Sequence, residues 1–353
     1  MTNQWLCSVS LCSAILLLVG CDSASTPSAK SGSDDSAPAP LSTLTGDIKI
    51  DGSSTVLPIS NAIKEQFEVE FPNVNVSVSG AGTGNGFERF QKEETDISGA
   101  SRPIKPGEFA ACQEAGVEFI ELPVAYDGLT IVVHPSNDWV QQLTVEQIQK
   151  IFVGDEAAKT WKDVDPAWPA EPIQIFAPGT GSGTYDYFVE VVVGKSGNEL
   201  RGDMSLNEDD NVLVQGVAGS KNAIGFFGVA YYEENRDKLR AVPIVNPEDD
   251  QAYLPTKENI AQNQYAPFSR PLFIYVNSES LNKAQVQTFV EYYMENASTT
   301  SEQVGYVRLP DDVIARGMAN LDAVKTGTHF VDEQGNSRRG PISQIFVDST
   351  LVQ

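Results

Sequence analysis

Strand-like and helix-like segments alternate through most of this chain, and this alternation limits the folds open to it. Residues 47–51 alternate polar and apolar side chains, which predicts a strand. The next segment, 57–70, places Ile59, Ile63 and Phe67 on one face of a helix. Such alternation is typical of α/β proteins, so we predict this class.

The same patterns continue toward the C-terminus without a long internal repeat. Further strands are predicted at residues 74–78, 96–100, 129–133, 173–176, 224–229 and 272–276. Helices are predicted to open at Gly86 and Tyr185, to follow the capping box Thr144–Gln147, and to end the fold at 284–294.

Three predicted strand-to-helix junctions are rich in glycine or hydroxyl side chains. Residues 79–86 are SGAGTGNG, residues 179–184 are GTGSGT, and residues 53–55 are SST. Glycine lets a backbone approach a ligand closely, and the free N–H groups at a helix N-terminus attract anions. Together they predict an anion site that requires no cationic side chain. The alternative is that each loop is an ordinary turn with a Ser or Thr N-cap.

Other chemistries fit the motifs poorly. The glycines at 80, 82, 84 and 86 give no G-x-G-x-x-G register, and no lysine follows to form a P-loop. Threonines at 180 and 184 exclude a G-x-S-x-G nucleophile elbow around Ser182. Two histidines and few cysteines disfavour zinc, and residues 203–214 lack the glycine and closing glutamate of a calcium loop. We therefore expect no catalytic residues, metal or cofactor.

The N-terminus carries signs of export. Residues 11–20 form an apolar run that is shorter than the roughly 20 residues needed to span a bilayer and has the length of a signal-peptide core. It ends in Leu-Val-Gly-Cys21, which resembles the bacterial lipobox, although no Lys or Arg precedes the run. The lipobox implies cleavage after residue 20 and acylation of Cys21, for example by palmitate. The alternative is an N-terminal helix of the mature fold.

Composition agrees with this reading. Residues 22–46 are mostly Ser, Ala, Pro, Asp and Gly, which predicts a disordered tether. Cys112 would be the one cysteine left unmodified after cleavage and acylation, and we expect it to be a small buried hydrophobic residue. The net charge of −24 and the lack of a basic cluster disfavour nucleic-acid binding. The expected mature length of about 330 residues favours two lobes over one core, because single cores rarely exceed roughly 250–300 residues.

The chain resembles the substrate-binding proteins of high-affinity bacterial phosphate ABC transporters, including the cyanobacterial phosphate-starvation lipoproteins. The motifs that carry this resemblance are DGSSTVLPIS, SGAGTGNGFERF, DISGASRPIK, YDGLTIVVHP, FAPGTGSGTYDYF, GVAGSKNAIGFFGVAYY and FSRPLFIYV. It implies the two-lobed periplasmic-binding-protein fold of type II, with phosphate in the inter-lobe cleft. We expect lobe one to be residues 47–124 plus 272–353 and lobe two to be residues 125–271.

The resemblance also implies the residues that contact phosphate, namely Ser54, Thr55, Thr83, Ser101, Ser182, Gly183 and Thr184. Two positions depart from the family pattern. Familiar members have Asp where this chain has Arg102, and Arg where it has Pro178. We infer that Arg102 supplies the positive charge, with Arg270 as the weaker candidate.

Phosphate near neutral pH carries a proton and sulfate does not, so a fixed carboxylate can select phosphate by accepting that proton. Asp127 is our candidate for this acceptor and Asp186 the alternative. The predicted protein is an extracytoplasmic, lipid-anchored, monomeric receptor that delivers phosphate to the permease subunits of an ABC transporter. The alternatives are a receptor for sulfate, molybdate or tungstate, a phosphatase that uses a loop serine, and a surface lipoprotein that senses or adheres.

Overall fold

The computed structural model describes residues 43–194 and 198–353. The predicted signal peptide 1–20, the lipobox Cys21 and residues 22–42 of the predicted tether lie outside the described residues. Within the described ranges, no helix has the length and apolar character needed to cross a membrane.

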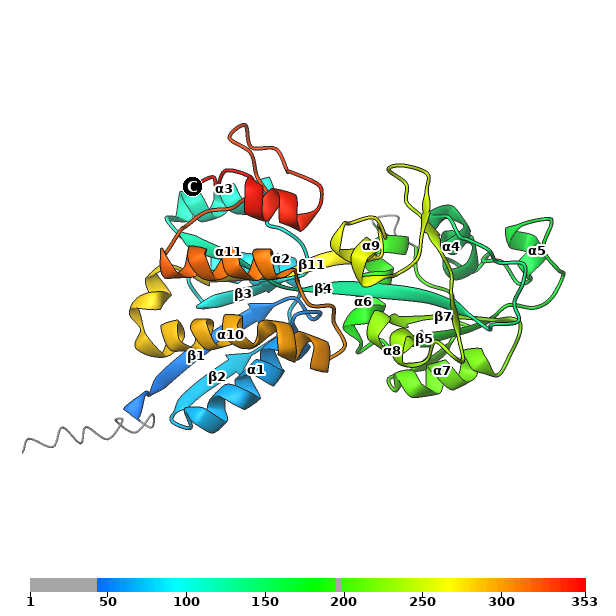
Figure 1. Ribbon diagram of the computed structural model, residues 1–353, viewed down its shortest axis with the longest axis horizontal. Coiled ribbons are helices and arrows are strands. Elements are labelled where there is room, and N and C mark those ends of the chain that lie inside the picture. Colours follow the sequence, from blue (N-terminus) through cyan, green and yellow to red (C-terminus); the bar gives the residue numbers. More distant parts are fainter. Residues whose placement is uncertain (1–42, 195–197) are drawn as a thin grey trace, which may run out of the picture. The chain divides into compact units, whose positions relative to one another are not determined.

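The described elements alternate as the sequence predicts (Figure 1). The strands are β1 (Gly46–Gly52), β2 (Val74–Val78), β3 (Ile97–Ala100), β4 (Phe119–Val133), β5 (Gln174–Pro178), β6 (Ser205–Asn207), β7 (Ala223–Gly228), β8 (Arg240–Ala241), β9 (Ile244–Val245), β10 (Ala252–Tyr253) and β11 (Ser269–Asn277). The helices are α1 (Leu57–Glu70), α2 (Thr83–Phe90), α3 (Pro106–Ala115), α4 (Val145–Phe152), α5 (Trp161–Val164), α6 (Gly183–Val192), α7 (Asp210–Ala218), α8 (Val229–Glu234), α9 (Lys257–Ala261), α10 (Ala284–Gln303) and α11 (Asp311–Asp322), with a 3-10 helix at Glu279–Asn282 and a π-helix at Ser343–Asp348.

The main sheet has the strand order β2-β1-β3-β11-β4-β7-β5-β6, and β8 also pairs with β4. The outer strands are parallel to their neighbours: β1 to β2 and β3 on one side, β5 to β6 and β7 on the other. The two central strands, β4 and β11, are antiparallel to each other and to the strands beside them. The α/β class is therefore confirmed, with β4 belonging to both halves of the sheet.

Strand β4 is longer than the sequence predicted. All 15 of its residues are buried, whereas the sequence indicated a strand only at residues 129–133. The prediction missed the first part because Glu121 and Asp127 interrupt the apolar run. Both carboxylates are buried with partners: Glu121 accepts hydrogen bonds from the Tyr275 hydroxyl at 3.0 Å and the Thr328 hydroxyl at 2.7 Å.

Three predicted helix boundaries were wrong. Helix α2 begins at Thr83 instead of Gly86, and α6 begins at Gly183 instead of Tyr185, so the glycine-rich loops supply the first turns of these helices. Helix α10 continues to Gln303 and is not the last helix, because α11 follows. Its second half packs through the small buried residues Ala297, Thr300 and Ser301, whose composition gives no strong apolar pattern.

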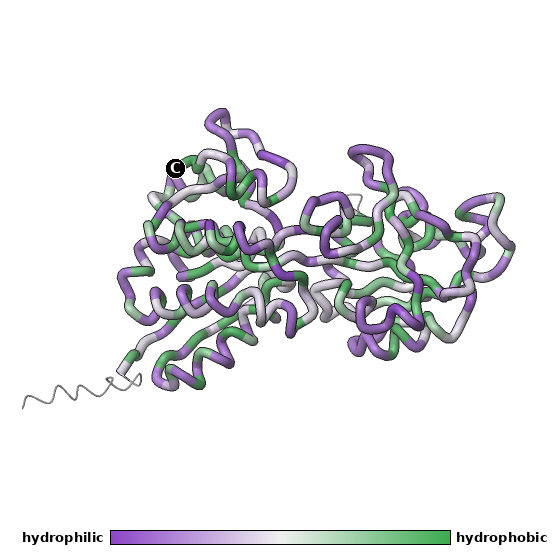
Figure 2. The backbone as a smooth tube through the Cα atoms, in the orientation of Figure 1, coloured by the Kyte–Doolittle hydropathy of each residue, from purple (hydrophilic) through white to green (hydrophobic). Residues whose placement is uncertain are grey.

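The hydrophobic core covers both faces of the sheet. In the tube coloured by hydropathy, hydrophobic segments follow the strands, while the outlying loops are mostly hydrophilic (Figure 2). One cluster joins β1 and β2 to α1 and α10, which pack against each other. Another extends from Phe87 of α2 to Phe226 of β7. Cys112 is buried in it, as predicted, and burial raises the pKa of its thiol to about 11.

Gly86 of α2 lies directly against β1. A Cβ atom at this position would be 2.5 Å from the Gly52 Cα atom and 2.9 Å from the Ser98 hydroxyl. We predict that Gly86→Ala lowers the free energy of unfolding by about 1–3 kcal/mol, because backbone must move to admit the methyl group. Gly84→Ala on the same helix is the control, since a Cβ there has no atom within 4 Å. It should be neutral or stabilising by about 0.5–1 kcal/mol. Urea unfolding measures both, and an equal loss in both variants would contradict the packing argument.

Candidate functional site

The three glycine- and hydroxyl-rich junctions are each a strand, a loop and a helix N-terminus, as predicted. They follow the carboxyl ends of β1, β2 and β5 and lead into α1, α2 and α6. In open α/β sheets, ligands bind at the carboxyl ends of parallel strands. The local sequence produces each junction because Ser, Thr and Gly favour caps and turns over continued strand.

The first junction is fixed to the neighbouring strand. The Ser53 amide donates to the Gly99 carbonyl oxygen at 2.9 Å, and the Thr55 amide donates to the Ser53 hydroxyl at 3.1 Å. Thr55 is almost fully buried, and its carbonyl oxygen accepts a hydrogen bond from the Tyr306 hydroxyl at 2.8 Å. Both sides of this loop are therefore held in place.

The second junction brings together Thr83 and Ser101, two residues that the resemblance implied. Their hydroxyl oxygens are 3.1 Å apart, and the Ser101 amide donates to the Thr83 hydroxyl at 3.2 Å. Asp51 of β1 connects this loop to α2. Its carboxylate accepts a hydrogen bond from the Ala81 amide at 3.1 Å and forms an ion pair with Arg89 of α2. The motif analysis did not single out Asp51 or Arg89.

The third junction caps α6. The Ser182 hydroxyl accepts a hydrogen bond from the Thr184 amide at 3.2 Å, which is the geometry of an N-cap. The Gly181 amide donates to the Glu208 carboxylate at 3.2 Å. A negative charge therefore lies beside a loop whose amides are suited to an anion. Glu208 follows β6, is remote in sequence, and was missed by the motif analysis.

The first and third junctions touch each other, although they belong to opposite halves of the sheet. A Cβ atom on Gly183 would be 3.1 Å from the Thr55 Cα atom and 3.4 Å from the Ser54 carbonyl oxygen. The Ser54 hydroxyl also donates to the Asp186 carboxylate in the first turn of α6, at 3.0 Å. Two positive helix N-termini thus converge at Thr55 and Gly183.

Arg270 is the cation that reaches this point. It lies directly opposite Asp127 in the pairing of β11 with β4, and its Nε atom is 3.4 Å from the Asp127 carboxylate. Its two terminal nitrogens donate to the Thr55 hydroxyl at 3.0 Å and to the Glu190 carboxylate at 2.8 Å. The guanidinium stacks on the Tyr187 ring at 3.5 Å, and the side chain is only 11% exposed. Burial raises the pKa of Asp127, and the positive charge of Arg270 opposes that rise.

Arg102, the cation favoured by the sequence, has different partners. Its guanidinium makes a two-pronged ion pair with Glu108 of α3, at 2.7 and 2.8 Å, and lies 5.8 Å from the centre of the Phe87 ring. Among the described residues, no hydrogen bond joins it to Thr55 or to the α6 junction. Its role in anion binding stays a prediction, whereas Arg270 contacts Thr55 directly.

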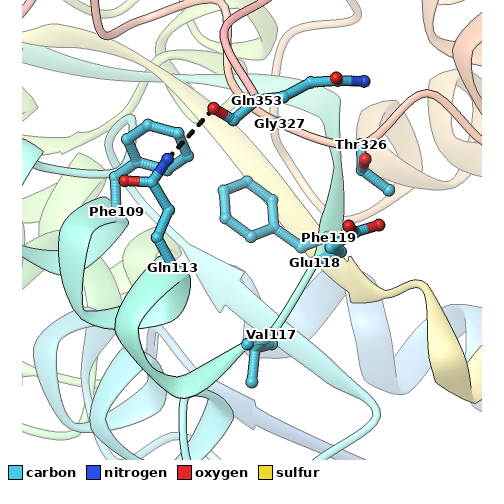
Figure 3. A pocket seen from close by; sticks show the side chains of 9 residues that line it. Phe109, Gln113, Val117, Glu118, Phe119, Thr326, Gly327 and Gln353 are labelled. Atoms are coloured by element: carbon cyan, nitrogen blue, oxygen red, sulfur yellow. Dashed lines mark hydrogen bonds between the residues drawn. The ribbon is translucent and has the colours of Figure 1, made fainter.

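A separate pocket of about 380 Å³ lies beside α3 (Figure 3). Phe109, Val117 and Phe119 line it, and the Gln113 side chain donates to the Gln353 carbonyl oxygen at 3.1 Å. No cation and none of the predicted phosphate ligands lines it, so its chemistry does not suit an anion. In the part of the chain that the structure describes, no group of three or more His, Cys, Asp or Glu residues could hold a metal ion.

Comparisons with known proteins identify the family of this chain. Residues 31–297 match the family described as PBP superfamily domain. Protein SphX of Synechococcus elongatus is 46% identical over 285 residues, which cover 80% of this chain and 83% of that protein. The phosphate-binding protein PstS of Staphylococcus saprophyticus is 41% identical over 283 residues, which cover 79% of this chain and 85% of that protein.

A solved structure gives the same result for the fold. The crystal structure of a possible phosphate binding protein from Planctomyces limnophilus is 42% identical, with a TM-score of 0.78. The match covers 80% of this chain and 100% of that one. The expected two-lobed periplasmic-binding-protein fold is thereby confirmed.

Removal of the Arg270 guanidinium would leave Asp127 buried without its ion-pair partner. We predict that Arg270→Met lowers the free energy of unfolding by about 3–5 kcal/mol near neutral pH. A carboxyl whose pKa is raised on folding contributes stability that is lost as pH rises through that pKa, so the loss should be larger at pH 8 than at pH 5.

The double variant Arg270→Met/Asp127→Asn should recover part of this stability and lose the pH dependence. Arg236→Met is the control, because Arg236 is 55% exposed and its ion pair with Glu233 lies at the surface. Its cost should stay below about 1 kcal/mol. Urea unfolding at both pH values measures all three, and a loss with Arg270→Met that does not depend on pH would contradict the role given to Asp127.

Proposed function

The chain belongs to the PBP superfamily and, within it, to the family of the SphX and PstS phosphate-binding proteins, and on this premise we propose that it binds inorganic phosphate and delivers it to an ABC transporter. One structural observation supports the proposal independently of the related proteins. The N-termini of α1 and α6 approach each other from opposite halves of the sheet, and the Arg270 guanidinium donates to Thr55 at the same point. Helix N-termini and a buried guanidinium both bind phosphate oxygens well.

The remaining site residues extend this binding surface. Thr83 and Ser101 form one hydroxyl pair, and the capped loop 182–184 supplies amides and hydroxyls from the opposite half. In this proposal Arg270 supplies the positive charge, and Arg102 stays a secondary candidate. Because most donors are backbone amides, hydroxyls and one paired cation, binding depends little on the net charge of −24.

Selection of phosphate over sulfate requires an acceptor for the phosphate proton. Asp127 remains our candidate, because it is buried beside Arg270 and only one of its oxygens faces the Arg270 Nε atom. Asp186 is the alternative, since it already accepts a hydrogen bond from Ser54. A carboxylate in this place leaves a sulfate oxygen facing a negative charge, which costs binding free energy.

We also propose the lobe boundaries 47–124 plus 272–353 and 125–271. Both divisions fall inside the long strands, between Val124 and Ala125 of β4 and between Pro271 and Leu272 of β11. A shift in the pairing register lies between Leu272 and Phe273. Bulged or irregular pairing is a place where strands bend, so this is the proposed hinge of lobe closure.

The rest of the proposal concerns the environment of the protein. A lipobox at Cys21 supports cleavage, acylation and anchoring of an extracytoplasmic monomer to a membrane. We propose a receptor without catalytic activity, because no serine in the junctions has a histidine base among its hydrogen-bond partners in the described chain.

Equilibrium binding of radiolabelled phosphate to the purified full-length chain tests the function. We expect saturable binding of one phosphate per chain, weak competition by sulfate, and a loss of at least about tenfold in affinity for Arg270→Gln, because a charged hydrogen-bond donor is removed. Absence of saturable binding would refute the proposal. Equal competition by sulfate, or tighter binding of molybdate, would assign the site to another oxyanion, and turnover of a phosphomonoester would indicate an enzyme.

Glu208 provides a sharper test of the α6 junction. Glu208→Gln keeps an oxygen that can accept the Gly181 hydrogen bond but removes the negative charge beside the loop. We predict that phosphate affinity rises about threefold to tenfold at low ionic strength, because a charge repulsion of roughly 1 kcal/mol is lifted. Glu156→Gln, an exposed change in the same lobe, is the charge-matched control and should leave the affinity unchanged. An unchanged affinity in Glu208→Gln would place the anion away from this loop.

A further inference from the structure

A second cavity, of about 300 Å³, opens beside Arg270. Its lining is unusually basic for this chain: Arg102, Lys105, Arg270, Arg338 and Arg339 line it, with Glu248 as the acidic side chain among them. The whole chain has 24 basic and 48 acidic residues, so an even distribution would put twice as many acids as bases here. The cavity is therefore a local reversal of the overall charge.

The charges on this lining are not all neutralised. Arg102 is paired with Glu108, and Arg270 with Asp127 and Glu190. Lys105 and Arg339 are exposed, and no ion pair holds either of them within the described part of the chain. These two side chains are therefore not committed to an ion pair and can orient toward an approaching anion.

Arg338 adds a fixed positive charge to the same wall. Its guanidinium donates to the carbonyl oxygens of His329 at 2.9 Å and Thr350 at 2.7 Å, and to the Ser349 hydroxyl at 3.0 Å. These acceptors are neutral, so they hold the group in place without cancelling its charge. Asp332 is a nearby carboxylate, but Arg338 is not its main partner. The pKa of Asp332 is lowered mostly by a hydrogen bond from the Asn336 amide, and Arg338 makes the smallest contribution.

The cavity and the candidate phosphate site share one residue. Arg270 forms part of its wall and also donates to the Thr55 hydroxyl. The lining comes from both predicted lobes, with residues 102–105 and 337–340 from lobe one and Glu248 and Asn263 from lobe two. An anion in the cavity would thus contact the residue whose guanidinium donates to Thr55.

We propose that this basic cavity is a vestibule that attracts doubly charged oxyanions, inorganic phosphate in particular, and passes them to Arg270. The inference rests on the proposed function and adds a kinetic role for residues outside the binding site. A chain with a net charge of −24 repels phosphate at long range, which slows encounter. A basic opening beside Arg270 offsets this repulsion locally, over about one Debye length, which is about 10 Å at 0.1 M salt.

The test compares two double variants that change net charge equally. Lys105→Gln/Arg339→Gln removes two vestibule charges, and Lys92→Gln/Lys162→Gln removes two exposed charges, after α2 and in α5, outside the cavity lining. Stopped-flow fluorescence with phosphate gives association and dissociation rates for the full chain. We expect the vestibule variant to associate about threefold to tenfold more slowly than wild type at 10 mM ionic strength. The control should differ by less than about twofold, and the difference should vanish near 1 M salt, where the Debye length is about 3 Å.

A variant that accelerates binding completes the design. Glu248→Gln removes the acidic residue of the lining and should speed association at low salt, which a misfolded protein would not do. Equal association rates for wild type and both double variants would overturn the vestibule but leave phosphate binding intact. Faster dissociation at an unchanged association rate would overturn it also, because Lys105 or Arg339 would then contact the bound anion. If wild type binds no phosphate at all, the proposed function itself fails.

Discussion

The antiparallel pairing of β4 with β11 is the constraint on which the rest of the structure depends. It extends from Phe119 opposite Asn277 to Gly128 opposite Ser269, and β4 then continues into the second half of the sheet. Directly opposite side chains on such strands are neighbours, so this register places Arg270 against Asp127. A slip of one residue would turn Arg270 to the other face of the sheet and remove the cation from Thr55.

The other end of the same pairing is fixed by a buried carboxylate. Glu121 of β4 accepts hydrogen bonds from Tyr275 of β11, from the Thr328 hydroxyl and from the His329 amide at 2.9 Å. These bonds attach the C-terminal segment to the two central strands. Burial raises the pKa of Glu121 to about 7, and the three donors partly offset this rise. Glu121 and Asp127 thus lie near the two ends of the β4–β11 pairing and make polar contacts that a purely apolar strand would lack.

The sequence was informative where structure is local. Glycines and hydroxyls at 53–55, 79–86 and 179–184 predicted the three junctions, because caps and turns depend on a few neighbouring residues. The partners of charged side chains were not predictable in this way. Arg270 and Thr55 are 215 positions apart, and Glu208 reaches the α6 loop from 27 positions away. Only strand order and register bring these residues together, which is why Arg102, with its conspicuous place in the motif, was preferred to Arg270. The prediction ended helix α10 too early, at residue 294 instead of Gln303, because the small buried residues of its second half give little periodic hydrophobic pattern.

The close approach of Gly183 to Thr55 has a consequence for the size of the ligand. At this point the two halves meet backbone against backbone, with room for barely a methyl group between them. A bare tetrahedral anion presents only oxygens to the surrounding amides, whereas an organic phosphate carries a substituent that needs additional room. If that substituent lay between Gly183 and Thr55, it would keep the two halves apart. A transporter that recognises only the closed form of the receptor would then not accept phosphate esters. The receptor would in this way select its ligand by size, through the conformation that it presents to the transporter.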